Sequence, residues 1–381
     1  MNAVYPWNLE SFARCFTGKL LAQRLGKISY SVYLWHWPIV VLLHYVGKQG
    51  ELVWNGCGLL LTLILGECSY RLVEAPSRQL FQFKVKWPGL SLVMLMLGVA
   101  AVGRVIYVSD GVPGSIRSKN SDEKALFVQH YVDLHQRGLI NAYRMECDFY
   151  DGRARRERIA ASCTPASAVG GLLLWGDSHA QALSLGLRQI PSVKGAFAQV
   201  ATSGCRPSLG GQRRKMEVDN NCDESNRFAL AEIKRLRPAV VVLAQEIDHE
   251  HTDWLSIANR LHGLGVQRVI LFGPVPRWRP SLPVVIANHY WDAPASYAKY
   301  GLDPVVFSTD RLLKKRYENS DQLEYVSAVD GLCRIEGCLA RLPNNGELMA
   351  VDYGHLSPTG STYVVAQLLT PVVERSLGKV N

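Results

Sequence analysis

Two short segments in the second half of the sequence carry residue types that together could transfer an acyl group. Residues 176–179 read Gly-Asp-Ser-His, and residues 352–357 read Asp-Tyr-Gly-His-Leu-Ser. A serine hydroxyl attacks a carbonyl carbon when a histidine takes its proton and a carboxylate orients that histidine. Ser178 is therefore the candidate nucleophile, His355 the candidate base and Asp352 its orienting carboxylate.

The surroundings of Ser178 suit this chemistry but also fit a plainer interpretation. An apolar strand pattern precedes the serine and a helical pattern follows it. A serine at such a turn has its hydroxyl at the sheet edge, and its N–H at a helix N-terminus is suited to an oxyanion. The alternative is a helix cap, in which the side chain of Asp177 or Ser178 accepts a hydrogen bond from an unpaired backbone N–H in the first turn of the helix. The second segment after the last strand favours the catalytic interpretation.

Short apolar runs alternate with helix-length segments around these two motifs. The runs are continuously apolar, which is typical of strands buried on both faces of a parallel sheet. They cover residues 172–175, 195–200, 239–244, 269–272 and 323–326. Helices are expected at residues 179–189, 226–235, 252–264, 307–318 and 359–377. This order predicts an α/β/α doubly wound parallel-sheet domain over residues 169–381, with ligands outside the carboxyl ends of the strands.

The first 110 residues have the composition of a membrane anchor. Residues 28–47 form a run of 20 positions without Asp, Glu, Lys or Arg, which is the length of one bilayer crossing. Further crossings are expected at residues 52–73 and 87–108, so the segment 1–110 should contain about three transmembrane helices. The alternative is that these are buried core helices. Residues 111–168 show no strand series and are interpreted as a linker or lead-in.

Loop charges predict the orientation of these helices. The loop between the first and second helices offers Lys48 alone. The other flanking cations lie before the first helix and between the second and third: Arg14, Lys19, Arg24, Lys27, Arg78, Lys84 and Lys86. By the positive-inside rule the N-terminus is cytoplasmic, and three crossings would export everything after about residue 110.

The cysteines are distributed as expected for an exported domain. Three of the nine, Cys15, Cys57 and Cys68, lie in the membrane segment. The other six form an even set, which in an oxidising compartment suggests three disulfides. Pairing of sequence neighbours would join 147 to 163, 205 to 222 and 333 to 338, although other connectivities are open. A zinc site is the alternative, and it lacks paired Cys-x-x-Cys spacing. The six are Cys147, Cys163, Cys205, Cys222, Cys333 and Cys338.

Composition excludes several classes of protein. Charged residues make up 20% and hydrophobic residues 48% of the chain, so a disordered protein is excluded. The net charge is +9, but no dense basic run is interleaved with aromatic residues. Nucleic acid is therefore not an expected partner.

The motifs also resemble known families. The Gly-Asp-Ser-His and Asp-x-x-His-Leu-Ser segments resemble the SGNH hydrolase superfamily, named for its Ser, Gly, Asn and His. Residues 26–38 (Gly-Lys-Ile-Ser-Tyr-Ser-Val-Tyr-Leu-Trp-His-Trp-Pro) and 70–78 (Tyr-Arg-Leu-Val-Glu-Ala-Pro-Ser-Arg) resemble late segments of the type 3 membrane acyltransferases. Together they resemble the fused class in which such an acyltransferase carries a periplasmic SGNH domain. Those proteins O-acetylate bacterial surface polysaccharides such as the lipopolysaccharide O-antigen.

The resemblance implies further site residues. The N–H groups of Ser178 and Gly204 would form the oxyanion hole. The superfamily's Asn is missing after the third strand, where Gln245 stands. The Gln245 side chain could supply an amide, or it could be a surface residue. No bound cofactor and no metal are expected, and the acyl donor would be acetyl-CoA or a relayed acetyl group.

The resemblance also implies a setting. The fused class has more membrane helices than this sequence offers, so the chain is expected to be N-terminally truncated. A separate membrane acyltransferase subunit or a soluble acyl carrier would then supply the donor. The expected activity is O-acyl transfer to a surface polysaccharide at the bacterial inner membrane, with the C-terminal domain in the periplasm. The alternatives are a periplasmic carbohydrate or lipid esterase of the SGNH type and a non-catalytic glycan-binding subunit.

Overall fold

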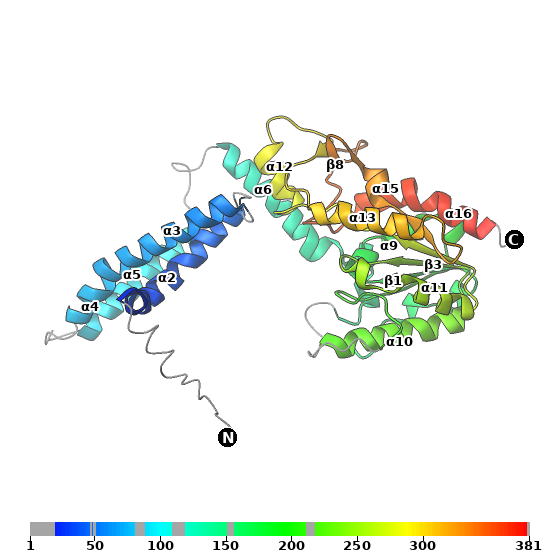
Figure 1. Ribbon diagram of the computed structural model, residues 1–381, viewed down its shortest axis with the longest axis horizontal. Helices are drawn as coiled ribbons and strands as arrows, with labels where there is room; N and C mark the ends of the chain where they lie inside the picture. Colours follow the sequence, from blue (N-terminus) through cyan, green and yellow to red (C-terminus); the bar gives the residue numbers. More distant parts are fainter. Residues whose placement is uncertain are drawn as a thin grey trace, which may run out of the picture. The chain divides into compact units, whose positions relative to one another are not determined.

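A computed structural model describes residues 20–45, 48, 51–80, 88–108, 119–150, 156–210 and 218–378. The chain divides into two compact units, Met1–Ser121 and Asp122–Asn381, and each is described by itself. Figure 1 shows the helices of the first unit in blue and cyan and the elements of the second in the later colours.

Helices occupy all three stretches where crossings were expected. They are α2 (Leu20–Tyr45), α3 (Leu52–Ser69), which continues through the π-helical turn η1 (Tyr70–Glu74) into α4 (Ala75–Leu80), and α5 (Pro88–Val108). Within the described residues, one stretch, Leu52–Ser77, is long and apolar enough to cross a membrane. A shorter apolar stretch, Met96–Val105, lies in α5.

Small residues allow α2 and α3 to pack closely. Gly58, Thr62 and Gly66 recur every four residues on the buried face of α3, the spacing that lets helix backbones approach in a membrane. At one end of this pair, the Glu67 carboxylate accepts hydrogen bonds from Arg24 and Arg71, both at 2.6 Å. The Glu67 carboxylate is therefore paired with two guanidinium groups, and such pairing lowers the cost of a charge in an apolar helix.

The second unit is built on a five-stranded, fully parallel sheet in the order β2-β1-β3-β4-β6. All five strands lie where apolar runs predicted them, with ends shifted by up to two residues. They are β1 (Leu172–Gly176), β2 (Phe197–Ala201), β3 (Val240–Ala244), β4 (Arg268–Phe272) and β6 (Glu324–Val326). The strand order reverses between β1 and β3, which is where ligands bind in sheets of this kind.

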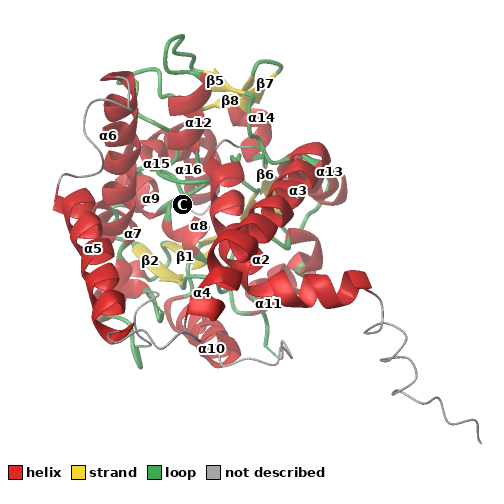
Figure 2. Ribbon diagram, turned by 90° about the vertical axis from the view of Figure 1, so that its left-hand side faces the viewer, coloured by secondary structure: helices red, strands yellow, loops and turns green. Residues whose placement is uncertain are grey.

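Helices cover both faces of the sheet, as the continuous apolarity of the strands requires. Leu172 and Leu174 of β1 pack into one buried cluster with α9 (Ser184–Gln189), α15 (Pro358–Val364) and α16 (Thr370–Gly378). Leu173 and Trp175 pack into another with α10 (Val218–Leu236) and α11 (Trp254–Gly263). Figures 1 and 2 both show α10 on one side of the sheet and α9, α15 and α16 on the other. The α/β/α layering is confirmed.

Several helices differ from the expected ranges. The segment expected as one helix at 179–189 is two short helices, and the last expected helix is interrupted by a π-helical turn. Four more helices, α6, α7, α12 and α14, were not foreseen. The helices are α6 (Lys119–Asp133), α7 (Ile140–Tyr143), α8 (Ser178–Gln181), α9 (Ser184–Gln189), α10 (Val218–Leu236), α11 (Trp254–Gly263), α12 (Leu282–His289), α13 (Pro304–Tyr317), α14 (Ala328–Leu332), α15 (Pro358–Val364) and α16 (Thr370–Gly378), with π turns η2 (Leu134–Gly138) and η8 (Val365–Leu369).

Two further features were not visible in the sequence. Short strands β5 (Tyr297–Ala298), β7 (Cys333–Arg334) and β8 (Gly337–Leu339) form a small antiparallel sheet. Its strands are too short to show a periodic pattern. The lead-in segment from residue 122 packs into the core of the α/β unit, where Tyr131, Leu139 and Tyr143 are buried.

Candidate active site

Ser178 lies at the turn between β1 and α8, as the first residue of the helix. The turn is tight because Gly176 passes next to β3, where a Cβ atom would lie 1.9 Å from the Ala244 carbonyl oxygen. Asp177 caps the helix, and its Oδ1 atom accepts the His179 N–H at 2.8 Å. Its Oδ2 atom accepts the Glu246 N–H from the loop after β3 at 2.7 Å. Asp177 is therefore the helix cap, and the Ser178 hydroxyl is left for other partners.

The structure brings the three predicted catalytic side chains into one chain of hydrogen bonds. Ser178 and His355 are 177 residues apart, yet Oγ of the serine lies 2.9 Å from Nε2 of the histidine. Nδ1 of His355 lies 2.7 Å from Oδ2 of Asp352. A carboxylate only accepts, so Nδ1 carries the proton of the neutral ring and Nε2 accepts from the serine. This arrangement can take a proton from the Ser178 hydroxyl.

The loop of residues 352–357 holds the histidine in place. Oδ1 of Asp352 accepts the main-chain N–H groups of Gly354 and His355, at 2.9 and 2.8 Å. Ser357 caps α15 by accepting the Gly360 N–H at 2.9 Å. One carboxylate thus fixes both the backbone of the loop and the ring of its histidine.

The electrostatics match these roles. Burial acts to raise the pKa of Asp352, but hydrogen bonds from His355 and from the loop backbone lower it to about 2. Burial acts to lower the pKa of His355, and the Asp352 carboxylate outweighs it and raises that pKa. The carboxylate is therefore ionised at neutral pH and stabilises a protonated His355.

Ser178 and Gly204 carry the two backbone N–H groups that were expected to form the oxyanion hole. The Ser178 N–H is at the first position of α8, and the Gly204 N–H follows β2 in a turn where Gly204 has φ +71°. Within the described residues, neither N–H donates to a protein acceptor. The positive φ favours glycine at 204.

Gln245, the other donor considered, is engaged elsewhere. Its side chain is buried, and its Nε2 atom donates to the Ile247 carbonyl at 2.7 Å and to Thr252 Oγ1 at 3.1 Å. An amide nitrogen has two hydrogens, so both are used within the loop after β3. Gln245 is neither a surface residue nor a free donor.

Three residues near the site were missed by the sequence analysis. Asp148, buried in the lead-in, accepts from the main chain and the side chain of Ser203. The His179 ring lies 4.7 Å from the His355 ring, and burial together with His355 holds its pKa well below the ordinary value. His135 lies beside Asp352, with Nδ1 3.5 Å from Oδ2. Only His179 had a sequence signal, its place directly after Ser178.

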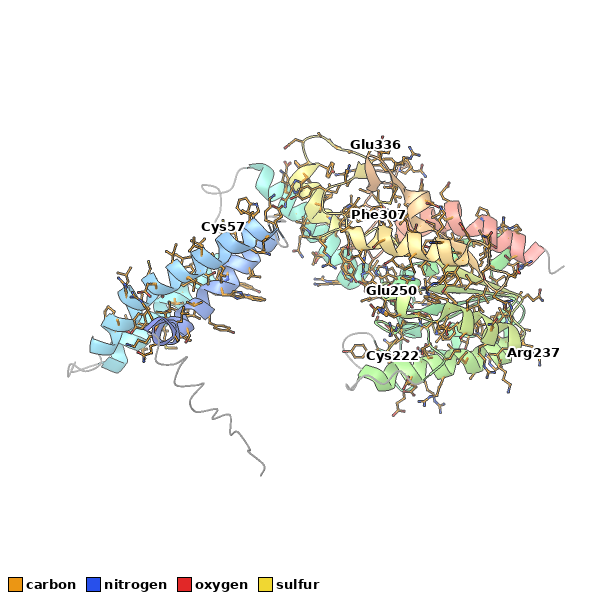
Figure 3. All side chains as sticks on the ribbon, in the orientation of Figure 1. Cys57, Cys222, Arg237, Glu250, Phe307 and Glu336 are labelled. Atoms are coloured by element: carbon orange, nitrogen blue, oxygen red, sulfur yellow. A yellow bond between two sulfur atoms is a disulfide. The ribbon has the colours of Figure 1, made fainter. Side chains whose placement is uncertain are left out.

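The six cysteines of this unit form the three disulfides proposed from sequence neighbours: Cys147–Cys163, Cys205–Cys222 and Cys333–Cys338. Two of them flank the site. Cys205 directly follows Gly204, and Cys147 directly precedes Asp148. Cys222, the disulfide partner of Cys205, is labelled near the start of α10 in Figure 3. In the first unit Cys57 and Cys68 are free, and Cys15 lies outside the described residues.

Comparison with known proteins agrees with this geometry. A family model described as "SGNH domain (fused to AT3 domains)" matches residues 146–370. The O-acetyltransferase OatA of Staphylococcus aureus is 42% identical over 79 residues, 20% of this chain and 13% of that protein. A putative peptidoglycan O-acetyltransferase of Bacillus subtilis, YrhL, is 34% identical over 108 residues, 24% of this chain and 16% of that protein. The chain therefore spans less than a fifth of these relatives.

A solved structure resembles a larger part of the chain. It is the periplasmic domain of a lipopolysaccharide acetyltransferase from Salmonella serovar Paratyphi A. The two are 26% identical with a TM-score of 0.50, and the match covers 62% of this chain and 97% of the other. The likeness thus extends over nearly the whole of that domain.

Proposed function

This chain belongs to the family of SGNH domains fused to AT3 domains, and we propose that it is a membrane-anchored O-acyltransferase that acetylates hydroxyl groups of a cell-surface polysaccharide. The observation that carries the proposal is the hydrogen-bonded series Ser178–His355–Asp352 at 2.9 and 2.7 Å. The relatives are named as O-acetyltransferases and a lipopolysaccharide acetyltransferase. These names support acetyl as the transferred group and a cell-surface polysaccharide as the acceptor.

The first half of the reaction would form an acyl-enzyme. Oγ of Ser178 attacks the donor's carbonyl carbon while its proton passes to Nε2 of His355. The developing oxyanion lies against the N–H groups of Ser178 and Gly204, and Asp352 stabilises the imidazolium. The leaving group takes the proton from His355, and the acetyl group remains as an ester on Ser178.

The second half would deliver the acetyl group to a sugar. The acceptor hydroxyl gives its proton to His355, and its oxygen attacks the ester carbonyl of the acyl-enzyme. The Ser178 oxygen leaves and recovers a proton from His355, so the site returns to its starting state. Water in place of the sugar would make the same residues an esterase.

We further propose that three helices cross the inner membrane, that the N-terminus is cytoplasmic and that the α/β unit is periplasmic. The helices at all three expected stretches and the charges of the flanking loops support this topology. The three disulfides support an oxidising compartment. The acceptor would be a surface polysaccharide such as the lipopolysaccharide O-antigen.

The acetyl donor would be acetyl-CoA or an acetyl group relayed by a separate membrane acyltransferase subunit. Because acetyl-CoA is cytoplasmic and the proposed site is periplasmic, a relay across the membrane would be needed. Affinity purification of the full chain from the membrane, followed by identification of co-purifying membrane acyltransferases, tests the relay.

The main test compares surface polysaccharide from cells that express wild type or Ser178→Ala at equal levels. We expect base-labile O-acetyl signals in the proton NMR spectrum with wild type and their loss with Ser178→Ala. Equal acetylation in both strains would overturn the proposal. Fewer acetyl groups with wild type than with Ser178→Ala would indicate an esterase. Failure of a fluorophosphonate probe to label Ser178 would indicate a non-catalytic glycan-binding subunit.

A further inference from the structure

A second imidazole approaches the carboxylate of the candidate active site from the lead-in segment. His135 lies in the π-helical turn η2, and its Nδ1 atom is 3.5 Å from Oδ2 of Asp352. The same oxygen accepts the hydrogen bond from Nδ1 of His355 at 2.7 Å. The His135 and His355 ring centroids are 5.5 Å apart. Two imidazoles therefore converge on one carboxylate oxygen.

These three side chains match the ligand set of a borderline-soft divalent cation. One ligand atom from each of His135, Asp352 and His355 lies within 4.8 Å of the other two. Zinc binds nitrogen and carboxylate oxygen at about 2.0–2.2 Å in a tetrahedron, which puts neighbouring ligand atoms about 3.4 Å apart. The His135–Asp352 separation of 3.5 Å already has this value. The His355–Asp352 pair, at 2.7 Å, would have to open slightly.

The cluster is also accessible to an ion. The His135 side chain is 45% exposed, whereas those of Asp352 and His355 are 15% and 11% exposed. An ion would arrive from the His135 side and meet two preorganised ligands behind it. Three protein ligands leave the fourth tetrahedral position for water.

We propose that Zn²⁺ binds to His135, Asp352 and His355 and inhibits the enzyme reversibly. His355 would bind through Nδ1, the atom that faces Asp352. Its proton would move from Nδ1 to Nε2, so the ring stays neutral and no net proton is lost. A ring that carries its proton on Nε2 cannot accept the proton of Ser178, and Asp352 no longer orients the ring. The inhibitory consequence rests on the proposed function, whereas the binding does not.

The chain offers a natural control cluster. Asp248, Glu250 and His251 also lie close enough to share an ion, and Glu250 is labelled in Figure 3. The His251 side chain is 68% exposed, and this cluster supplies two carboxylates and one imidazole. Zinc prefers nitrogen more than magnesium or calcium does, so the site with two histidines should be the stronger for Zn²⁺.

The test uses the untagged full chain in detergent, stripped with EDTA and freed of chelator. Zinc affinity is measured by competition with a chromophoric chelator for wild type, His135→Phe and His251→Asn. Hydrolysis of 4-nitrophenyl acetate is measured in parallel, with each variant compared with its own rate in EDTA. We expect one tight zinc site in wild type, at least tenfold weaker binding in His135→Phe and no change in His251→Asn. The zinc concentration for half inhibition should rise at least tenfold in His135→Phe.

The outcomes test the zinc site and the inhibition by zinc separately. No tight zinc binding by wild type, or equal binding by His135→Phe, would overturn the site. Binding without inhibition, or inhibition equally strong with Mg²⁺, would overturn the inhibitory mechanism. If the EDTA-treated wild type hydrolyses no ester, the proposed function fails, and the chelator competition still decides the zinc site. Ser178→Ala should bind zinc as wild type does, because the serine is not a ligand.

Discussion

Asp148 holds Ser203 through both its main chain and its side chain. The Ser203 N–H donates to Oδ1 of Asp148 at 3.2 Å, and Oγ of Ser203 donates to Oδ2 at 2.6 Å. Gln181 of α8 donates to the same Oδ2 at 2.8 Å. One buried carboxylate therefore joins the helix that begins at Ser178 to the turn that presents the Gly204 N–H.

The first prediction concerns this carboxylate. In Asp148→Asn, an amide NH₂ would face donors of Ser203 or Gln181, so the turn should shift and misplace the Gly204 N–H. A shift of about 1 Å at a catalytic group can cost about 100-fold in rate. We expect kcat for a model ester to fall about 10- to 100-fold with KM little changed.

Ser203→Ala is the matched control, because it removes the hydroxyl but keeps the N–H bond to Asp148. Its loss of kcat should be clearly smaller. A folded Asp148→Asn protein, judged by an unchanged melting temperature, with wild-type kcat would show that the carboxylate does not position the turn.

The second prediction concerns the proposed catalytic side chains as one unit. Asp352→Asn should lower kcat about 10³- to 10⁴-fold, because the amide cannot accept from Nδ1 of His355 as a carboxylate does. Ser178→Ala and the double variant Ser178→Ala/His355→Ala should be equally inactive, since the two residues perform one proton transfer. Steady-state kinetics with a model ester measures all three. A multiplicative loss in the double variant would contradict a shared role.

The third prediction concerns pH. His355 must be neutral to act as a base, and the Asp352 carboxylate raises its pKa above the ordinary value. The rate should therefore fall as pH decreases through a pKa above about 6.5, the usual value for histidine. In Asp352→Asn the residual rate should begin to fall only at a lower pH, because the carboxylate that raises the pKa of His355 is gone. Profiles of kcat/KM against pH in EDTA measure both, and coincident acid limbs would contradict the assignment.

The fourth prediction compares two disulfides. Cys205 and Cys222 are 17 residues apart, and their bond anchors the turn containing Gly204. Cys333 and Cys338 are 5 residues apart. Loss of Cys205–Cys222 should lower the free energy of unfolding by about 3 kcal/mol, and loss of Cys333–Cys338 by about 2 kcal/mol. The first effect is larger because opening the longer loop gives the unfolded chain more entropy.

Removal of the two disulfides should have more different effects on activity than on stability. Cys205→Ser/Cys222→Ser should lose kcat, because the turn is released beside Ser178, and Cys333→Ser/Cys338→Ser should keep it. Calorimetry and ester hydrolysis below both melting temperatures measure the two effects. Equal kcat in the two folded double variants would show that Cys205–Cys222 does not support the site.

The sequence alone determined the elements that depend on local pattern. The five main strands were predictable because continuous apolar runs occur where both faces of a strand are buried, as at 240–244. The meeting of Ser178 with Asp352 and His355 was predictable because both motifs lie next to recognisable elements. The disulfides between sequence neighbours were proposed on spacing and agree with the structure.

The remaining parts depend on contacts between distant segments, which leave no periodic signal. Asp148 and His135 belong to a lead-in with no strand series, and only its packing against the α/β unit brings them to Ser203 and Asp352. Gln245 was ambiguous because the direction of an amide depends on which partners surround it, here Ile247 and Thr252. Local sequence thus sets which residues can react, whereas packing between distant segments sets the distances and charges at which they meet.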